Sequence, residues 1–383
     1  MKVALVHDWL TGMRGGEKCL EAFCELFPDA PIFTLIYVKG SVSSIIERHR
    51  IIPSLLSHFP RAGTWYRYYL PLFPFAIQSF DLRGYDMILS SSHCVAKGVQ
   101  VPANTFHISY LHSPMRYVWD QYDQYFGKGK CSGLVRIMMS MLRPRLQHWD
   151  SRSNKHVHSF LANSQNVSER ISRYYGRMAF VVHPPVEWKA FQASKVDEGF
   201  YLMVTAFAPY KRIDLAIEAA NTMGFPLKII GQGQEEKRLK QMAGPTVEFL
   251  GWQADEQVRA FYSRCRAVLF PGEEDFGIVP LEAMASGKPV IAYGKGGVLE
   301  TVIPLDSSSL TPKEDVTFTG IFFYEQSVEA IIKAIRNFEK HQGEFCADAI
   351  RAHVETFDQS YFKQRVQQVI FSSYEEFRRS HSC

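Results

Sequence analysis

Two carboxylates, Glu274 and Glu282, lie eight positions apart in a stretch with a glycine turn between them. The stretch PGEEDFGIVPLEAMASG occupies residues 271–287 and follows the apolar run 267–270, which predicts a buried parallel strand. With one carboxylate in the loop and the other in the first turns of a helix, both side chains can face one ligand. Carboxylates at this spacing can accept hydrogen bonds from hydroxyl groups at two separate points along a sugar-containing ligand.

Residues 279–286 are predicted to form a short helix after that turn. Pro280 suits its first turn and Gly287 suits its end. A helix that starts directly after a strand presents backbone N–H groups to an anion. A phosphate held by these amides and flanked by the two carboxylates describes a nucleotide-sugar site. The alternative is an ordinary strand-to-helix turn with two surface glutamates.

The composition is that of a globular protein large enough for two domains. The chain has 383 residues, of which 46% are hydrophobic and 21% charged. A formal net charge of +4 gives no indication of nucleic-acid binding. The seven cysteines show no spacing typical of a zinc site or a disulfide framework, which favours a reducing compartment. The N-terminus resembles a first strand and not a signal peptide, and no apolar run is long enough to span a membrane.

A glycine-rich loop is predicted near the N-terminus, over residues 8–16, between a strand at 2–7 and a helix. The loop contains Gly15 and Gly16 but lacks the GxGxxG pattern, so a dinucleotide site is not supported. A first turn without any ligand is the alternative.

Two further segments of the first half combine apolar with basic residues. Residues 61–80 are dense in aromatic side chains, contain Arg61 and Arg67, and are interrupted by prolines. They suit either contact with lipid headgroups or burial against the sheet. A helix predicted over 133–154 mixes methionine with arginine, and the sequence does not decide between the same two alternatives.

His112 follows the predicted strand 105–111 and begins the segment HSPMRYVWD. A histidine at the carboxyl end of a parallel strand lies where open α/β sheets bind ligands. A histidine with only a structural role is the alternative.

In the second half, predicted strands are followed by residues suited to bind a donor substrate. Lys211 and Arg212 follow the strand 201–205 and precede a helix, where cations oppose the helix dipole unless an anion lies between them. Gly231 follows the strand 227–230. Trp252 follows another strand, and for this residue packing is the safer interpretation than stacking on a base.

These motifs resemble the signature of the retaining GT-B glycosyltransferases of family 4. The resemblance rests on Glu274 with Phe276 and Gly277, on the run from Glu282 to Ile291, and on Gly296, Gly297 and Glu300. It covers nearly the whole chain and is strongest over 201–302. His112–Asp120 and Tyr210–Asp214 look most similar to a mannosyltransferase branch that acts in bacterial surface polysaccharide assembly.

The resemblance implies roles for individual residues. Glu274 would hold hydroxyls of the donor sugar and Glu282 the ribose. His112 would contact the transferred sugar or help to organise the leaving group. Lys211, the amides of Gly277–Val279 and the helix N-terminus would stabilise the leaving diphosphate. Ala206 stands where the family has an arginine, and Arg212 is the expected substitute. The full set of expected donor-binding residues is Gly15, Gly16, Lys211, Arg212, Gly231, Trp252, Glu274, Phe276, Gly277, Ile278, Val279 and Glu282, with His112, Glu274 and Lys211 expected to be catalytic.

The implied fold is α/β: GT-B, with two doubly wound Rossmann-like domains facing a cleft. We expect an acceptor-binding domain over 1–187, completed by a C-terminal helix at about 360–383, and a nucleotide-sugar-binding domain over 188–359. The region 306–319 is predicted to be an exposed loop.

The implied function is retaining sugar transfer, with GDP-mannose as donor and a lipid-linked oligosaccharide or polysaccharide as acceptor. We expect no cofactor, no required metal and no nucleic-acid partner, and a location on the cytoplasmic face of the inner membrane. A nucleotide-sugar epimerase or phosphorylase with the same fold, or a catalytically degenerate scaffold of a polysaccharide assembly complex, remains as an alternative.

Overall fold

The computed structural model describes residues 1–127, 131–305 and 317–380. Most of the loop predicted over 306–319 lies outside the described residues. Contacts between Cα atoms divide the chain into two compact units. Unit 1 comprises Met1–Pro185 and Gln359–Cys383, and unit 2 comprises Val186–Asp358.

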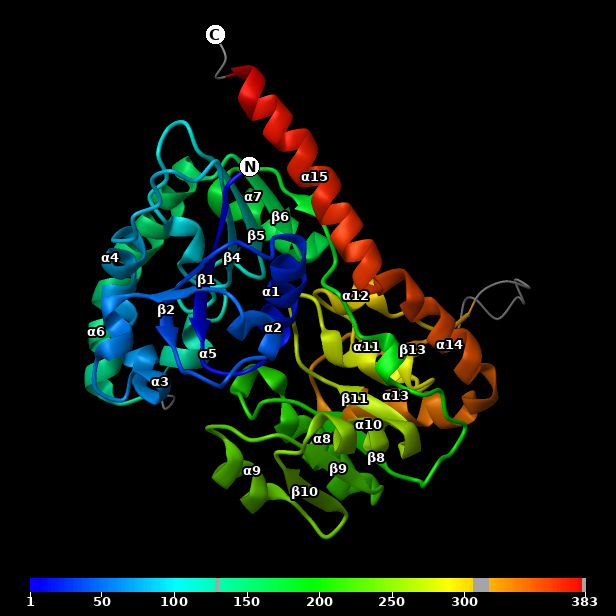
Figure 1. Ribbon diagram of the computed structural model, residues 1–383. Helices are drawn as coiled ribbons and strands as arrows, with labels where there is room; N and C mark the ends of the chain where they lie inside the picture. Colours follow the sequence, from blue (N-terminus) through cyan, green and yellow to red (C-terminus); the bar gives the residue numbers. More distant parts are fainter. Residues whose placement is uncertain (128–130, 306–316, 381–383) are drawn as a thin grey trace. The chain divides into compact units, whose positions relative to one another are not determined.

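Unit 1 is built on a parallel sheet with the strand order β3-β2-β1-β4-β5-β6-β7 (Figure 1). Its strands are β1 (Val3–Leu10), β2 (Ile32–Tyr37), β3 (Ile51–Pro53), β4 (Met87–Ser92), β5 (Phe106–Leu111), β6 (Ser159–Ala162) and β7 (Phe180–Val181). Its α-helices are α1 (Gly15–Leu26), α2 (Ser44–Glu47), α3 (Ala62–Trp65), α4 (Phe73–Gln78), α5 (Tyr122–Phe126), α6 (Gly133–Arg152), α7 (Gln165–Tyr175) and α15 (Gln359–Ser380).

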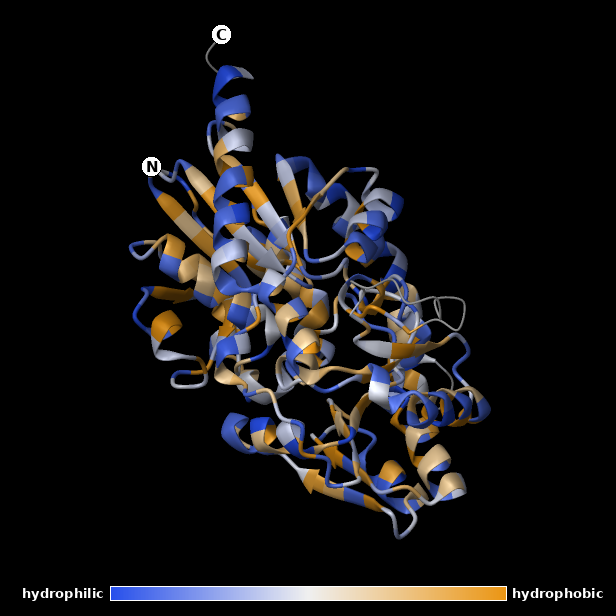
Figure 2. Ribbon diagram, turned by 90° about the vertical axis from the view of Figure 1, so that its right-hand side faces the viewer, coloured by the Kyte–Doolittle hydropathy of each residue, from blue (hydrophilic) through white to orange (hydrophobic). Residues whose placement is uncertain are grey.

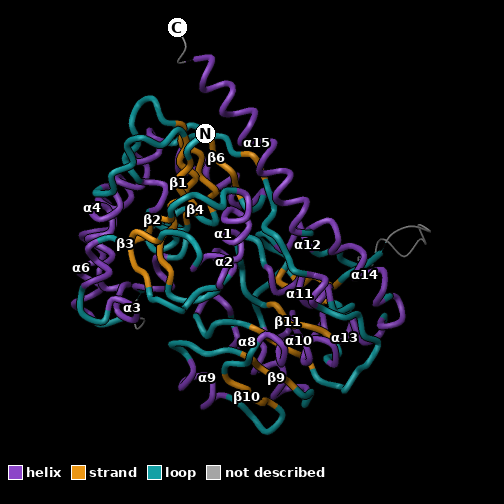
Figure 3. The backbone as a smooth tube through the Cα atoms, viewed as in Figure 1, coloured by secondary structure: helices purple, strands orange, loops and turns teal. Residues whose placement is uncertain are grey.

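The two faces of this sheet are covered by different helices, because alternate residues of a strand point to opposite sides. Val3 and Leu5 of β1 pack in a core with α1 and α15. Ala4 and Val6 pack in a second core with α4 and α6. Figure 3 shows the strands enclosed by helices, and Figure 2 shows that the strands are mainly hydrophobic.

Unit 2 repeats the architecture with the strand order β10-β9-β8-β11-β12-β13, again all parallel. Its strands are β8 (Tyr201–Val204), β9 (Leu227–Ile230), β10 (Val247–Gly251), β11 (Ala267–Phe270), β12 (Val290–Tyr293) and β13 (Gly320–Phe323). Its α-helices are α8 (Ile213–Met223), α9 (Glu236–Met242), α10 (Asp255–Arg264), α11 (Ile278–Ala285), α12 (Val298–Thr301), α13 (Val328–Lys340) and α14 (Ala347–Val354).

The N-terminal strand is longer than the sequence predicts. The strand expected to end at His7 continues to Leu10, so Asp8 belongs to β1 and not to the glycine-rich loop. A charged residue is not expected at a fully buried position of a strand. The Asp8 carboxylate is tolerated there because it accepts hydrogen bonds from four backbone N–H groups. The loop that remains before α1 spans residues 11–14.

The last helix completes the core of unit 1. Phe362 is 3% exposed, and its ring centroid lies 5.6 Å from those of Phe23 in α1 and Tyr110 in β5. Val366, Val369 and other residues one or two turns further along lie in the same core.

We expect Phe362→Ala to destabilise unit 1 by about 3–5 kcal/mol, because it leaves a cavity in a closed aromatic cluster. Phe371→Ala on the same helix is the matched control: Phe371 is 66% exposed, and its loss should change stability by less than about 0.5 kcal/mol. Denaturant unfolding followed by circular dichroism measures both. Equal effects of the two substitutions would show that α15 does not complete this core.

Candidate functional site

Lys211 and Glu274, two of the predicted functional residues, follow strands on either side of the point where the sheet of unit 2 reverses its winding. This point lies between β8 and β11, and the corresponding point in unit 1 lies between β1 and β4. Open α/β sheets bind ligands at this position, because helices leave on opposite faces there and open a crevice. Lys211 follows β8 and Glu274 follows β11, and Ser91 in β4 lies next to β1.

Lys211 and Glu274 meet in unit 2. The Lys211 ammonium donates to a carboxylate oxygen of Glu274, and the two side chains are only 12% and 19% exposed. The two residues are 63 positions apart in the sequence. The pairing therefore results from the parallel arrangement of β8 and β11, which brings the two loops to the same edge.

Glycine at position 272 allows the two loops to touch. A Cβ atom built on Gly272 would lie 2.9 Å from the Cα atom of Lys211 and 2.9 Å from the carbonyl oxygen of Tyr210. Real Cβ atoms essentially never approach so closely, so any larger residue would push the two loops apart. The glycine thus places the Lys211 ammonium beside Glu274.

Helix α11 begins where the sequence predicts an anion-binding turn. Gly277 is its N-cap residue with φ 90°, a conformation that favours glycine. The amides of Ile278 and Val279 belong to the first turn, where no preceding helical turn supplies an acceptor. The Phe276 side chain is buried in the core, so this residue can meet a donor only through its backbone.

Glu282 is held by a buried tyrosine. Its carboxylate accepts a hydrogen bond of 3.0 Å from Tyr262 Oη. Burial, together with the Glu282 charge, raises the pKa of Tyr262 well above its usual value, so the hydroxyl keeps its proton and remains a donor. No sequence pattern indicated that this tyrosine belongs to the site.

Arg212 adopts a left-handed conformation, with φ 49° and ψ 42°, at the start of α8. Its Nε atom lies 3.3 Å from the carboxylate of Asp214 in the first turn of that helix. Asp214 and Glu274 thus supply anions for the two cations, and no external anion is needed to explain their position at a helix start.

Gly231 and Trp252 are two other residues predicted to bind the donor. A Cβ atom on Gly231 would overlap the carbonyl oxygen of Thr205, so close backbone packing alone requires glycine there. Trp252 is 70% exposed, and the expectation that it packs in the core is wrong. It follows the end of edge strand β10, where the described residues do not cover it.

In unit 1, His112 lies against the N-terminus of α1, which begins at Gly15. A Cβ atom on Gly16 would be 3.7 Å from His112 Nε2 and 3.6 Å from His7 Cε1, so Gly16 and both imidazoles form one cluster. His112 Nε2 lies 2.9 Å from Ser91 Oγ. Burial lowers the pKa of His112 well below its usual value, and the ring is therefore neutral at pH 7.

The turn after β4 is anchored by Asp8. The two oxygens of this carboxylate accept hydrogen bonds of 2.6 to 3.0 Å from the backbone N–H groups of residues 93–96. Four such donors to one carboxylate order the turn and compensate the cost of burying the charge.

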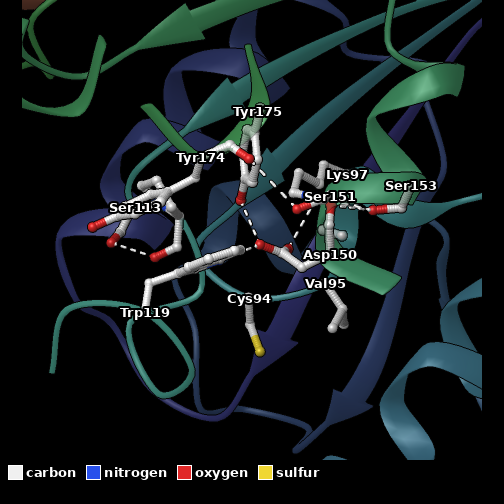
Figure 4. A network of polar contacts seen from close by, with 12 residues as sticks. Cys94, Val95, Lys97, Ser113, Trp119, Asp150, Ser151, Ser153, Tyr174 and Tyr175 are labelled. Atoms are coloured by element: carbon white, nitrogen blue, oxygen red, sulfur yellow. Dashed lines mark hydrogen bonds and ion pairs between the residues drawn. The ribbon is translucent and has the colours of Figure 1, made fainter. Parts of the chain in front are cut away.

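A buried ion pair positions the segment that follows His112 (Figure 4). Lys97 and Asp150 are both fully buried, and Lys97 Nζ lies 3.0 Å from Asp150 Oδ1. The other carboxylate oxygen of Asp150 accepts hydrogen bonds of 2.8 Å from Trp119 Nε1 and from Tyr175 Oη. Since Trp119 belongs to the HSPMRYVWD segment, the network ties that segment to the end of α6 and to α7.

The sequence could not show these partners. Asp8 and the amides that it accepts from are about 85 positions apart, and Lys97 and Asp150 are 53 apart, so no local spacing reveals either contact. Among the described residues, no group of three or more His, Cys, Asp or Glu side chains is arranged to hold a metal ion.

Comparison with known proteins gives the class of unit 2. Residues 186–355 match the family model for glycosyl transferases group 1, and this range is nearly the whole of unit 2. Unit 2 is a group 1 glycosyltransferase domain. The family resemblance stated from the sequence is thereby confirmed.

Curated relatives match parts of the chain. An uncharacterized glycosyltransferase of Methanocaldococcus jannaschii is 32% identical over 37% of this chain and 41% of its own length. The O-antigen chain mannosyltransferase C of Escherichia coli is 33% identical over 25% and 28%. The O-antigen chain mannosyltransferase RfbU of Salmonella typhimurium is 26% identical over 57% and 61%. The matched stretch is thus less than two thirds of each relative.

Solved structures share the fold over almost the entire chain. Sucrose-phosphate synthase from Thermosynechococcus elongatus superimposes with a TM-score of 0.73 at 18% identity, covering 98% of this chain and 100% of that one. Anabaena Alr3699/HepE, solved in complex with UDP, has a TM-score of 0.69 at 17% identity and covers 97% and 100%. The prediction of a GT-B fold with two doubly wound sheets is confirmed.

The buried ion pair gives a testable consequence for unit 1. We expect Lys97→Met to cost about 3–5 kcal/mol of unfolding free energy, since it leaves the Asp150 charge buried without its cation. Arg83→Met, which breaks an exposed pair with Asp81, is the control and should leave the denaturant midpoint unchanged. If the two variants unfold at the same midpoint, the Lys97–Asp150 pair is not a structural anchor.

Proposed function

We propose that this protein is a retaining glycosyltransferase that transfers mannose from GDP-mannose to a lipid-linked oligosaccharide or polysaccharide. The meeting of Lys211 and Glu274 beside the N-terminus of α11 supports this proposal most directly. A leaving nucleoside diphosphate gains charge during transfer, and a fixed ammonium with first-turn amides is suited to stabilise that charge.

Within this proposal each group has one task. Lys211 and the amides of Gly277–Val279 bind the diphosphate, Glu274 accepts hydrogen bonds from sugar hydroxyls, and Glu282 accepts them from the ribose. The pairing of Glu274 with Lys211 orients the carboxylate before the sugar arrives. His112 contacts the transferred sugar.

The choice of mannose rests on relatives. The Escherichia coli and Salmonella typhimurium proteins are named as O-antigen chain mannosyltransferases, and a Mycobacterium tuberculosis relative, 34% identical over 28% of this chain, is named as a GDP-mannose-dependent alpha-mannosyltransferase. The names of these relatives support GDP-mannose as the donor, and nucleotide binding tests it directly.

We expect GDP to raise the melting temperature selectively among GDP, UDP, dTDP and ADP, with and without magnesium. A ligand at 100 times its dissociation constant contributes about 2.7 kcal/mol, which a melting curve resolves. Lys211→Met should abolish the shift. Lys228→Met is the matched control, since Lys228 is a partly exposed lysine of the same domain paired with Glu248 at 3.1 Å.

The outcomes separate the alternatives. A selective shift with another nucleotide would contradict GDP-mannose as the donor but would still support a glycosyltransferase. No shift with any nucleotide would favour a scaffold role, for which Ala206 is the one sequence feature. Glu274→Gln should reduce transfer about 100-fold without changing the melting temperature if the site is catalytic, and a scaffold would show no transfer to reduce.

The acceptor side of the proposal includes contact with a membrane through the segments 54–80 and 131–149. Neither segment contains Asp or Glu, and together they carry five arginines. The first segment buries Tyr66, Leu70 and Phe73 against the sheet, and α6 buries Met139 and Leu146 in the same core. Figure 1 draws α3, α4 and α6 on the same side of the sheet of unit 1.

The opposite faces of these segments are apolar and exposed. Tyr68 and Phe75 are each 76% exposed and Leu134 is 79% exposed. Other large hydrophobic side chains exposed on the two segments are Leu55, Phe59, Trp65, Leu72, Ile137, Met138 and Met141. In the described part of the chain no helix is both long and apolar enough to cross a bilayer. An acid-free surface that mixes aromatic residues with arginine suits peripheral binding to anionic lipid.

We expect the protein to sediment with vesicles that contain phosphatidylglycerol and phosphatidylcholine more than with phosphatidylcholine alone, and less at high salt. Replacing Tyr68, Phe75 and Leu134 by serine should weaken binding at least about tenfold, given about 1.5–3 kcal/mol for each large apolar side chain buried. The control replaces Tyr361 and Phe371, exposed on α15, by serine. Equal loss in both variants would contradict this surface.

A further inference from the structure

A chain of polar contacts leads from the interior of unit 1 to His112. Glu17 Oε1 lies 3.6 Å from His7 Nε2. His7 Nδ1 lies 3.1 Å from Ser91 Oγ, and Ser91 Oγ lies 2.9 Å from His112 Nε2. The four residues come from α1, β1, β4 and the end of β5, so the chain forms only in the folded sheet.

The inner members of this chain are inaccessible to solvent. Glu17 is 3% exposed, Ser91 is 1% exposed and His7 is fully buried. Burying three polar side chains in a row is costly unless each one is paired with the next. No other side chain hydrogen-bonds to the His112 ring in the described part of the chain, so Ser91 determines which ring nitrogen faces inward.

Glu17 determines which group donates and which accepts in each hydrogen bond of this chain; we call this arrangement the proton order. It lies in the first turn of α1, near the positive end of the helix dipole. Burial raises the pKa of its carboxyl, whereas His7, His93 and a backbone hydrogen bond lower it, and the pKa is lowered overall. His7 Nε2 has no hydrogen-bond partner among the described residues, but it faces the carboxylate at 3.6 Å. A negative carboxylate repels a ring lone pair and attracts an N–H group, so the proton of His7 is favoured on Nε2.

The remaining protons follow from this step. With a neutral His7, Nδ1 is an acceptor, and the Ser91 hydroxyl donates a hydrogen bond to it. The Ser91 oxygen then accepts from His112 Nε2–H, and His112 Nδ1 keeps its lone pair. A second proton on His7 would reverse both hydrogen bonds: His7 Nδ1–H would donate to Ser91, and Ser91 would donate to His112 Nε2. The distance of 3.6 Å between His7 and Glu17 is longer than a charge-assisted hydrogen bond and favours the neutral order.

The other titratable groups near His112 do not take over the role of this chain in setting its tautomer. The Asp8 carboxylate accepts from the four backbone amides described above and lies 3.2 Å from His93 Nδ1. The His93 ring lies 6.3 Å from the His112 ring, centroid to centroid, and burial lowers the pKa of His93 to about 3, so it stays neutral. Arg116 also acts on His112 electrostatically, and as a cation it disfavours protonation of that ring. Arg14 and Arg116 act in the same way on His93.

We propose that Glu17, His7 and Ser91 are positioning residues that hold His112 in the Nε2–H tautomer, so that Nδ1 accepts a hydrogen bond from a substrate hydroxyl. The proton order rests on the contacts within unit 1, and only the role of the Nδ1 lone pair rests on the proposed glycosyl transfer. The two parts can therefore fail separately.

The test compares two serines of the same strand. Ser91→Ala removes the acceptor for His112, whereas Ser90→Ala removes a contact of 2.9 Å between equally buried Ser90 and His107. We expect nitrogen-15 NMR of the full-length protein to show His112 as the Nε2–H tautomer in wild type and in Ser90→Ala. In Ser91→Ala the two tautomers should be mixed, and Ser91→Thr, which keeps the hydroxyl, should restore the single form.

Activity gives the second measurement. We expect Ser91→Ala to lower kcat about tenfold with the donor KM unchanged, which corresponds to about 1.4 kcal/mol, while Ser90→Ala keeps the wild-type kcat. An Nδ1–H tautomer in wild type, or an unchanged tautomer in Ser91→Ala, would overturn the proposal. If no sugar transfer is found at all, the proposed function fails, and the tautomer measurement still decides the proton order.

Discussion

The site of unit 1 depends on the hydrogen bonds between the Asp8 carboxylate and the backbone amides of residues 93–96. A buried charge at the end of the central strand is tolerated only because four backbone amides point at it. Those amides belong to the turn that follows β4, so the same contact fixes Ser91 just before the turn and Lys97 just after it. Ser91 then reaches His112, and Lys97 reaches Asp150, which holds the segment after His112 through Trp119. One electrostatic requirement in β1 thus orders both sides of the histidine.

In unit 2 the loops of the site are also held in place by ion pairs, but these pairs are less buried than the Lys97–Asp150 pair of unit 1. Its loops approach closely because glycine stands at 272, and its cations are paired with Glu274 and Asp214, which remain partly exposed. A partly exposed ion pair can exchange partners at little cost, whereas a fully buried one cannot. The two units share a strand order but differ in this respect. Unit 1 holds its polar groups in fixed positions, and unit 2 offers charged groups that an anionic ligand can recruit.

The sequence predicted the elements and the loops better than it predicted their partners. Apolar runs located strands such as β5, β9 and β11, and the α11 turn was found from its residues alone. Strand β13 and helix α14 were missed, because the four-residue run GIFF follows a long polar region and α14 is only eight residues long. Trp252 was wrongly expected in the core, since residue type says little about burial beside an edge strand. The partners of Asp8, His112 and Lys97 lie 21 to 88 positions away and are decided by strand order, which no local pattern encodes.

The position of α15 in the core of unit 1 has a consequence for synthesis on the ribosome. Unit 2 is continuous, Val186–Asp358, and can close its core as soon as it emerges, but unit 1 must wait for the helix at Gln359–Ser380. At about 5–20 residues per second, the first 185 residues would remain incomplete for roughly 10 to 35 s while the intervening unit is made. During that interval the apolar groove that receives Phe362, formed by side chains such as Phe23 and Tyr110, is open to water. The order of translation therefore makes the N-terminal half of the chain the one that needs protection from aggregation, although its strands are synthesised first.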